Sequence, residues 1–245
     1  MTSVDVFGVP VAAGPAGAVF DELRSWVTVG RRSYVCCANV HVVETAQRDP
    51  ALAQALRSAG VVLPDGAPIA WLASARSGLQ TSRIAGADLF EHLCRCGGYR
   101  HFLLGSTPAT LRLLEREMRA RFGAEVVGTH APPFGDLTDP DVEAMAAAVN
   151  RTHADIVWVG MGAPRQEVLM QRLRPLVEPS ILAGVGAVFD FYAGTRTRAP
   201  LWMQSLGLEW LYRLAREPAR LWRRYLRTNA SFLLRVLRSV VAKPL

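Results

Sequence analysis

Short apolar segments alternate with longer segments of helical periodicity through most of this 245-residue chain. Six of the short segments have the length and residue types of buried strands: Tyr34–Ala38, Val61–Leu63, His101–Gly105, Glu125–Gly128, Asp155–Gly160 and Ser180–Gly184. Helices are predicted between them at Ala85–Cys96, Pro108–Phe122 and Pro140–Thr152. Strands that alternate with helices predict an α/β fold, in which helices cover both faces of a mainly parallel sheet.

The pattern changes near residue 195, after which no further strand is predicted. We expect one helix over Leu201–Ala215 and a second over Ala219–Val241. Pro218 can begin the second helix, because proline fits the first helical turn. The chain is therefore expected to contain an α/β domain, residues 1–195, and a helical C-terminal appendage, residues 196–245.

The appendage carries the whole net positive charge of the chain. It holds eleven Arg or Lys and two Glu, for a net charge of +9. The other 195 residues hold 17 basic and 19 acidic groups, a net charge of −2, and the chain total is +7. Three of the six tryptophans, Trp202, Trp210 and Trp222, also lie in the appendage. This composition predicts a near-neutral domain joined to a segment that meets an anionic surface or group.

The second appendage helix is amphipathic. Trp222, Leu226, Leu233, Leu237 and Val240 project within about 60° of one another, with arginines on the opposite side. Three interpretations stay open: packing on the domain with a solvated basic face, interfacial binding to an anionic membrane, and nucleic-acid binding. The domain shows no recognisable nucleic-acid module, so we expect no nucleic-acid partner.

Localisation and redox state are also indicated. No apolar run reaches the roughly 18–20 residues of a membrane span, and the N-terminal residues lack the pattern of a signal peptide. The four cysteines, Cys36, Cys37, Cys94 and Cys96, do not have C-x-x-C spacing. We therefore expect a cytoplasmic protein with reduced thiols, no metal site and no cofactor.

Polar residues follow two predicted strands directly. Asp65 comes just after Val61–Leu63, and Asn39 just after Tyr34–Ala38. Ligands of open α/β sheets bind beyond the carboxyl ends of the strands, so Asp65 is placed to act as a general base and Asn39 to bind a sugar hydroxyl. Either side chain can instead cap the helix that follows it.

Further candidates lie near the starts of other predicted helices. Arg83 can hold a phosphate or form a structural ion pair with Asp88. The glycines Gly160 and Gly162 follow the most apolar strand and allow the backbone to approach a ligand. Asp190, after a second glycine-rich segment, can bind a ribose hydroxyl. Neither segment completes a P-loop or a dinucleotide fingerprint.

Five motifs occur in a fixed order along the chain. They are Leu63-Pro-Asp-Gly66, Arg83-x-x-Gly86-x-Asp88-Leu89, Gly160-x-Gly162-x-Pro164-x-Gln166-Glu167, Gly184-Val-Gly186-Ala-x-Phe189-Asp190, and Arg198-Ala-Pro-x-Trp202 through Gly207-Leu-Glu-Trp210 to Glu217-Pro218-x-Arg220. In this order and spacing they resemble the WecG/TagA/CpsF family of bacterial glycosyltransferases, over about Val6 to Tyr225.

The resemblance implies a Rossmann-like domain with a helical appendage that closes the active site and touches the membrane. It implies an inverting, metal-independent enzyme that needs no cofactor. The donor is a UDP-sugar, with N-acetylmannosamine or a related sugar, and the acceptor is a polyprenyl-diphosphate-linked GlcNAc. Such enzymes work at the inner face of the cell membrane, in the synthesis of teichoic-acid linkage units or other surface polysaccharides. The oligomeric state, a homo-oligomer included, stays open.

The resemblance also implies roles for single residues. Asp65 is the base that takes the proton from the acceptor hydroxyl. The sugar pocket would be lined by Asn39, Arg83, Gln166 and Cys37. The nucleotide would be contacted by Gly160, Gly162, Asp190 and Phe134, and the Phe134 ring would stack on uracil. The diphosphate or the lipid would be contacted by Arg213, Arg220 and Arg223.

The chain departs from the family pattern at Cys37, where members commonly have threonine two positions before the matching Asn39. A thiol is a weaker hydrogen-bond donor than a hydroxyl, so the departure leaves the donor sugar open. An alternative hypothesis is a non-catalytic protein that binds nucleotide sugars, or acts as a scaffold, and reaches the membrane through its basic appendage.

Overall fold

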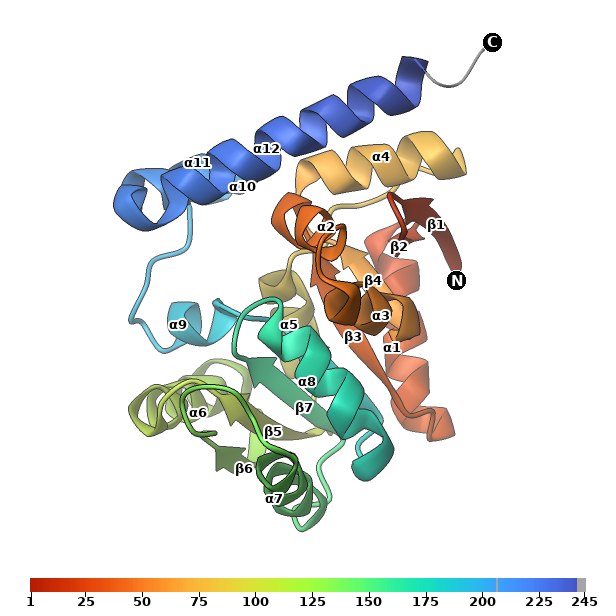
Figure 1. The fold of residues 1–245 in the computed structure, drawn as a ribbon. Helices are drawn as coiled ribbons and strands as arrows, with labels where there is room; N and C mark the ends of the chain where they lie inside the picture. The colour runs from red at the N-terminus through yellow and green to blue at the C-terminus, as the bar shows by residue number, and fades with distance from the viewer. Residues whose placement is uncertain (206, 242–245) are drawn as a thin grey trace.

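The computed structural model describes residues 1–205 and 207–241, and this part of the chain contains two sheets (Figure 1). The smaller sheet is an antiparallel hairpin of β1 (Thr2–Val6) and β2 (Val9–Ala13). The main sheet is parallel throughout and has the strand order β4-β3-β8-β7-β5-β6. Its strands are β3 (Ser33–Ala38), β4 (Val61–Pro64), β5 (Arg100–Gly105), β6 (Glu125–His130), β7 (Ile156–Gly160) and β8 (Ile181–Gly184).

Helices cover both faces of the main sheet. One face packs against α1 (Ala16–Val29), α5 (Gly86–Arg95), α6 (Pro108–Phe122) and α9 (Val188–Tyr192). The other packs against α2 (Val40–Ala46), α3 (Pro50–Ser58), α7 (Asp139–Asn150) and α8 (Arg165–Leu173), which a 3₁₀ turn, Arg174–Leu176, continues. The helix α4 (Ala67–Ser77) lies beside the hairpin. The predicted α/β fold with a Rossmann-like parallel sheet is confirmed.

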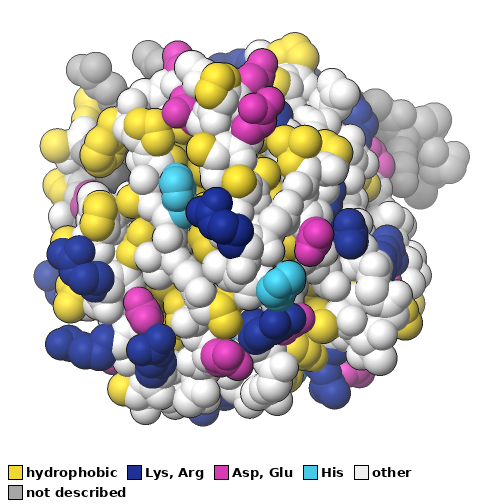
Figure 2. All heavy atoms as spheres, turned by 90° about the horizontal axis from the view of Figure 1, so that it is seen from below, with side chains coloured by type: hydrophobic (Ala, Val, Ile, Leu, Met, Phe, Trp, Pro, Cys, Tyr) yellow, Lys and Arg dark blue, Asp and Glu magenta, His cyan; other side chains and the backbone are white. Residues whose placement is uncertain are grey.

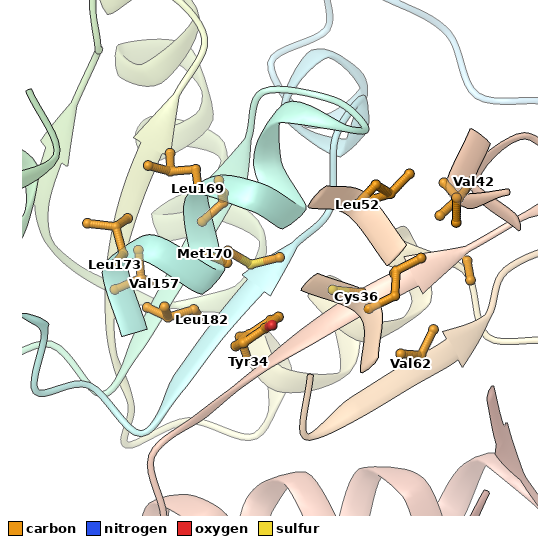
Figure 3. Close-up of a cluster of buried hydrophobic side chains, with 14 of the residues drawn as sticks. Tyr34, Cys36, Val42, Leu52, Val62, Val157, Leu169, Met170, Leu173 and Leu182 are labelled. Atoms are coloured by element: carbon orange, nitrogen blue, oxygen red, sulfur yellow. The ribbon is translucent and has the colours of Figure 1, made fainter. Parts of the chain in front are cut away.

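All six predicted strands are present, with ends that differ by two residues or fewer. Five of them could be predicted because they are almost fully buried and mainly apolar, whereas the edge strand β6 is largely half-buried or exposed. Successive side chains then point to opposite faces: Tyr34 and Cys36 join the cluster on the α2–α3–α8 side (Figure 3), whereas Val35 and Cys37 join the other cluster. All four cysteines are free thiols.

The N-terminal hairpin was not predicted. Its two-residue turn is Phe7–Gly8, with positive φ angles of 54° and 82°, where asparagine or aspartate followed by glycine would be the usual signal. Phenylalanine is unfavourable in this left-handed conformation. Tertiary contacts hold it, because the Phe7 ring packs edge-to-face on Phe232 and lies beneath the guanidinium groups of Arg76 and Arg235.

The described residues of the appendage form three helices where two were expected. α10 (Leu201–Ser205) and α11 (Glu209–Arg216) replace the single helix predicted over Leu201–Ala215, and that prediction is wrong. The physical reason is Gly207, whose φ of 72° is left-handed and interrupts a right-handed helix. A Cβ atom on Gly207 would lie only 2.9 Å from the Cβ atom of Ala67, so this turn touches the first residue of α4.

The long helix α12 (Pro218–Val241) begins one residue before its predicted start and lies across the top of the domain in Figure 1. It packs through one edge of its apolar side: Phe232 is buried, and Val236 packs on the same cluster. The centre of that side faces outward. Its exposed members are Trp222, Leu226, Leu233 and Leu237, which keep 48%, 66%, 61% and 62% of their surface.

The face of the molecule seen from below in Figure 2 differs from the exposed apolar side of α12 in its charge distribution. Acidic and basic side chains are interspersed there without a large region of one sign. None of the helices in the described part of the chain combines the length and the hydropathy of a membrane span.

Candidate functional site

The predicted site residues gather at one edge of the main sheet. β4, β3, β8 and β7 are consecutive and parallel, so their carboxyl ends lie side by side. Asp65 and Asn39 follow two of these strands, and Gly160 and Gly184 end the other two. This is the edge at which open α/β sheets bind ligands.

Asn39 and Asp65 form the centre of the site. The Oδ1 atom of Asn39 accepts the N–H of Val42 at 3.2 Å and so caps α2. Its Nδ2 atom donates to Oδ2 of Asp65 at 3.2 Å. The N-cap position of α4 is Gly66, with a φ of 105°, which leaves Asp65 one residue before the cap. Asn39 thus caps α2, one of its two predicted roles, and also orients a half-buried carboxylate, whereas its contact with a sugar hydroxyl stays a prediction.

Asp88 joins two arginines beside this centre. Its Oδ2 atom accepts the N–H of Ala85 at 3.0 Å and lies 3.2 Å from Nη2 of Arg83. Its Oδ1 atom accepts from Nη2 of Arg198 at 2.8 Å. The ion pair between Arg83 and Asp88, one of two open interpretations, is therefore present. A role for Arg83 in the sugar pocket stays a prediction.

Gln166 lies beneath the loops that follow β7 and β8. It is 4% exposed; its Oε1 atom accepts the N–H of Gly162 at 3.1 Å, and its Nε2 atom donates to Oε1 of Glu167 at 2.9 Å. A Cβ atom on Gly184 would lie 3.1 Å from Nε2 of Gln166. Both ends of this amide bind protein groups, so Gln166 shapes the glycine loops, and direct contact with a sugar stays a prediction.

Glu167 ends the third sequence motif, but the sequence assigned it no role at the site. It is fully buried, and its Oε2 atom has no hydrogen-bond partner among the described residues. Burial raises the pKa of Glu167 from 4.5 to about 7, against the opposing effect of the hydrogen bond from Gln166. The burial of Glu167 could not be predicted from its motif, because glutamate is almost never fully buried.

Gly160 and Gly162, the two glycines predicted to contact the nucleotide, are each needed for a different structural reason. A Cβ atom on Gly160 would lie 2.5 Å from the ring of Phe189, so the close approach there is to protein. Gly162 has a φ of 77° and open space where a Cβ atom would project, which suits approach to a ligand. Asp190, on α9, is half-buried and lies 3.4 Å from Nε of Arg196.

Cys37 and Phe134 have contrasting environments. Cys37 is 8% exposed, and burial, with a smaller contribution from Asp65, raises the pKa of its thiol well above the usual value. It is therefore a neutral group beside the carboxylate. Phe134 is 91% exposed on the loop between β6 and α7, which Arg165 holds by donating to the carbonyl of Gly135. Stacking of Phe134 on uracil stays a prediction.

The three predicted diphosphate arginines lie in helices of the appendage, Arg213 in α11 and Arg220 and Arg223 in α12. Their side chains lie outside the described part of the structure. The turn at Gly207 brings the appendage to Ala67, two residues beyond Asp65. In the described residues no three His, Cys, Asp or Glu side chains are grouped to hold a metal ion.

The fold and this edge define a class: Rossmann-like α/β proteins whose glycine loops and polar side chains form a ligand site at the ends of parallel strands. A family model, Glycosyl transferase WecG/TagA/CpsF family, matches residues 4–244. The chain therefore belongs to this family, which confirms the resemblance. It is a glycosyltransferase of cell-surface polysaccharide synthesis that takes a nucleotide-sugar donor and a sugar acceptor.

Proposed function

We propose that the protein is an inverting, metal-independent transferase that moves N-acetylmannosamine, or a related sugar, from UDP to a polyprenyl-diphosphate-linked GlcNAc. The observation that carries this proposal is the Asn39–Asp65 hydrogen bond at the carboxyl edge of the sheet, in a member of this family. A carboxylate held there has the position that a general base requires.

In the proposed reaction, a hydroxyl oxygen of the acceptor attacks the anomeric carbon from the face opposite UDP. A new carbon–oxygen bond forms, the bond to the diphosphate breaks, and the diphosphate leaves with the bonding electron pair. Asp65 accepts the hydroxyl proton, and Asn39 keeps the carboxylate oriented. Arginines of the appendage, Arg213, Arg220 and Arg223, would stabilise the charge on the leaving diphosphate without a metal.

The proposed mechanism gives separate roles to the two parts of the chain that the sequence distinguishes. Residues 1–195 would form the catalytic domain, and residues 196–245 the appendage that closes the site. The contact between Gly207 and Ala67 supports closure over the end of β4. The loop at Gly162 and the carboxylate of Asp190 would bind the nucleotide.

We also propose that the protein binds the inner face of the cell membrane through α12. The outward row of Trp222, Leu226, Leu233 and Leu237 supports this, because exposed apolar side chains beside arginines suit an interface with anionic lipids. The acceptor, a lipid-linked sugar, would lie in the same surface.

Flotation with phosphatidylglycerol vesicles tests the membrane proposal. The triple variant Leu226→Gln, Leu233→Gln and Leu237→Gln should bind at least about tenfold more weakly, since each change removes apolar area from the interface. Leu176→Gln, at a 45% exposed position in the turn after α8, is the matched control and should bind normally. Undiminished binding of the triple variant would refute the role of α12.

The transfer proposal is tested with purified protein, a panel of UDP-sugars and a short-chain polyprenyl-diphosphate-GlcNAc analogue, with products detected by mass spectrometry. We expect one added sugar and stoichiometric UDP. Binding of UDP-sugar without transfer for every donor would instead favour the non-catalytic scaffold.

A further inference from the structure

Two arginines in the connection between α9 and α10 each bridge the domain and the appendage. Arg198 binds Asp88 at 2.8 Å and lies 3.8 Å from Oε1 of Glu209, at the start of α11. Arg196 lies 3.4 Å from Asp190 and 3.4 Å from Glu217, just after α11. The two bridges have the same plan: a carboxylate at the site, an arginine, and a carboxylate of the appendage.

The two ends of α11 are held by different bridges. Glu209 is the first residue of α11, and Glu217 directly follows its last residue, Arg216. The connecting segment is itself fixed, because the buried Gln204 donates to the carbonyl of Ala199. A helix that is tied at both ends can neither swing nor slide freely over the site.

The bridging arginines are already matched in charge. Asp88 and Asp190 on the domain, with Glu209 and Glu217 on the appendage, provide two carboxylates for each arginine. Burial of Arg198 opposes its ionisation, but Asp88 and Glu209 outweigh this and raise its pKa. Both arginines are only 20% to 37% exposed. Matched in this way, they are poorly suited to bind the diphosphate of a donor.

We infer that Arg196 and Arg198 are positioning residues, a double clamp that sets α11 relative to Asp88 and Asp190 at the edge of the site. The clamp ties the site and the appendage together, because Asp88 also binds Arg83. Its effect on transfer rests on the proposed function, in which Arg213 of α11 contributes to the diphosphate site. The clamp itself depends only on the ion pairs.

Hydrogen–deuterium exchange on the full chain tests the clamp. The double variant Glu209→Gln and Glu217→Gln loosens only the appendage side and leaves Asp88, Asp190 and the arginines intact. Exchange in peptides of 196–216 should accelerate by about 5- to 30-fold, the effect of losing two partly exposed ion pairs. Peptides from β3 and β7 should be unchanged. Unchanged exchange in 196–216 would overturn the clamp.

Two companion variants separate charge from shape. Glu209→Asp with Glu217→Asp keeps both charges and should restore most of the protection. Glu178→Gln, an exposed acid on the turn before β8, should have no effect. Failure of the aspartate pair to restore protection would also overturn the clamp.

The same variants link the clamp to catalysis. With an active donor, the glutamine pair should lower kcat/KM by a similar 5- to 30-fold, and the aspartate pair should recover it. If no donor gives transfer but exchange responds as expected, the clamp stands and the proposed function fails. If transfer is normal in the glutamine pair and exchange does not change, the clamp fails and the proposed function stands.

Discussion

The appendage meets the domain in two places that differ in kind. At the far contact, α12 lies on α2 and the hairpin: Phe232 is 5% exposed and packs edge-to-face on Phe7, with ring centres 5.8 Å apart. Beside it, Arg235 donates to Oε1 of Glu44 at 3.0 Å, and Glu44 is 3% exposed. At the near contact, Arg196 and Arg198 form partly exposed ion pairs of 2.8 to 3.8 Å next to the site.

The far contact therefore anchors the appendage, whereas the near contact sets the position of α11. Burial makes the far contact costly to break, because apolar area and a nearly buried charge would both be exposed or left unpaired. The near contact is accessible to solvent and salt, which weaken it. Weakening the near contact would therefore release α11 over the site, while the far contact keeps α12 on the domain.

The largest effect is expected at the far contact. Phe232→Ala removes a buried ring and should lower the free energy of unfolding by about 3 kcal/mol, the lower part of the range for such truncations. Urea unfolding measures this loss. Leu233→Ala, at the neighbouring 61% exposed position, is the control and should change stability by less than about 0.5 kcal/mol. Equal losses for the two variants would contradict the packing of α12.

The ion pair of the far contact should come next. Arg235→Met leaves the Glu44 carboxylate unpaired and should cost about 2–3 kcal/mol, less than a fully buried pair because Arg235 is 37% exposed. Adding Glu44→Gln to this variant should recover at least half of the loss, as measured by the same urea unfolding. A double variant no more stable than Arg235→Met would show that the charge of Glu44 is not the cause.

A second buried glutamate, Glu167, provides a further comparison, because no arginine pairs with it among the residues that the structure describes. Glu167 receives a hydrogen bond from Gln166 and lies near the thiols of Cys36 and Cys37 on β3. Its folded pKa of about 7 lies above its usual 4.5. The stabilising effect of the proton is therefore full below pH 4.5 and is lost as the pH rises to 7.

The variant Glu167→Gln removes this titration. Between pH 4.5 and 8, its free energy of unfolding should rise relative to the natural protein by up to about 3 kcal/mol. Urea unfolding at the two pH values measures the change, with Glu178→Gln as the exposed control. A difference that does not depend on pH would mean that Glu167 ionises normally.

The smallest effect is expected at the near contact. Glu209→Gln with Glu217→Gln should lower the free energy of global unfolding by about 1–2 kcal/mol, because two partly exposed ion pairs contribute at most about 1 kcal/mol each. Thermal unfolding at low and at high salt checks this. A loss as large as that of Phe232→Ala would mean that both contacts are anchors.

The sequence predicted the parts of the fold whose local pattern agrees with their environment. The strands of the main sheet, the helix Pro108–Phe122 and the positions of Asp65 and Asn39 at strand ends follow from local signals. The hairpin turn at Phe7 could not be predicted, since contacts with distant residues hold it. Gly207 carried a local signal, a glycine within a helical pattern, and that signal was not used.

The other differences between prediction and structure concern which face of a helix is buried and which residues form ion pairs. Periodicity identified the apolar side of α12, but not that its edge packs inward while its centre faces outward. It placed arginines on the opposite side of this helix, but gave no sign that one of them, Arg235, pairs with Glu44. Arg198 stood in a motif and Arg196 beside it, yet the partner Asp88 of Arg198 lies 110 residues away, and Arg196 pairs with Glu217 on the far side of α11. Pairing of that kind is fixed by tertiary structure alone.

The most direct test of the account is the transfer assay with Asp65→Asn. Loss of the base should lower kcat by about 10²- to 10⁴-fold, whereas UDP-sugar should bind within a factor of about three of the natural protein. Asp21→Asn, on the exposed side of α1, is the matched control and should be fully active. Near-normal transfer by Asp65→Asn would contradict the central claim that the carboxylate held by Asn39 takes the proton from the acceptor.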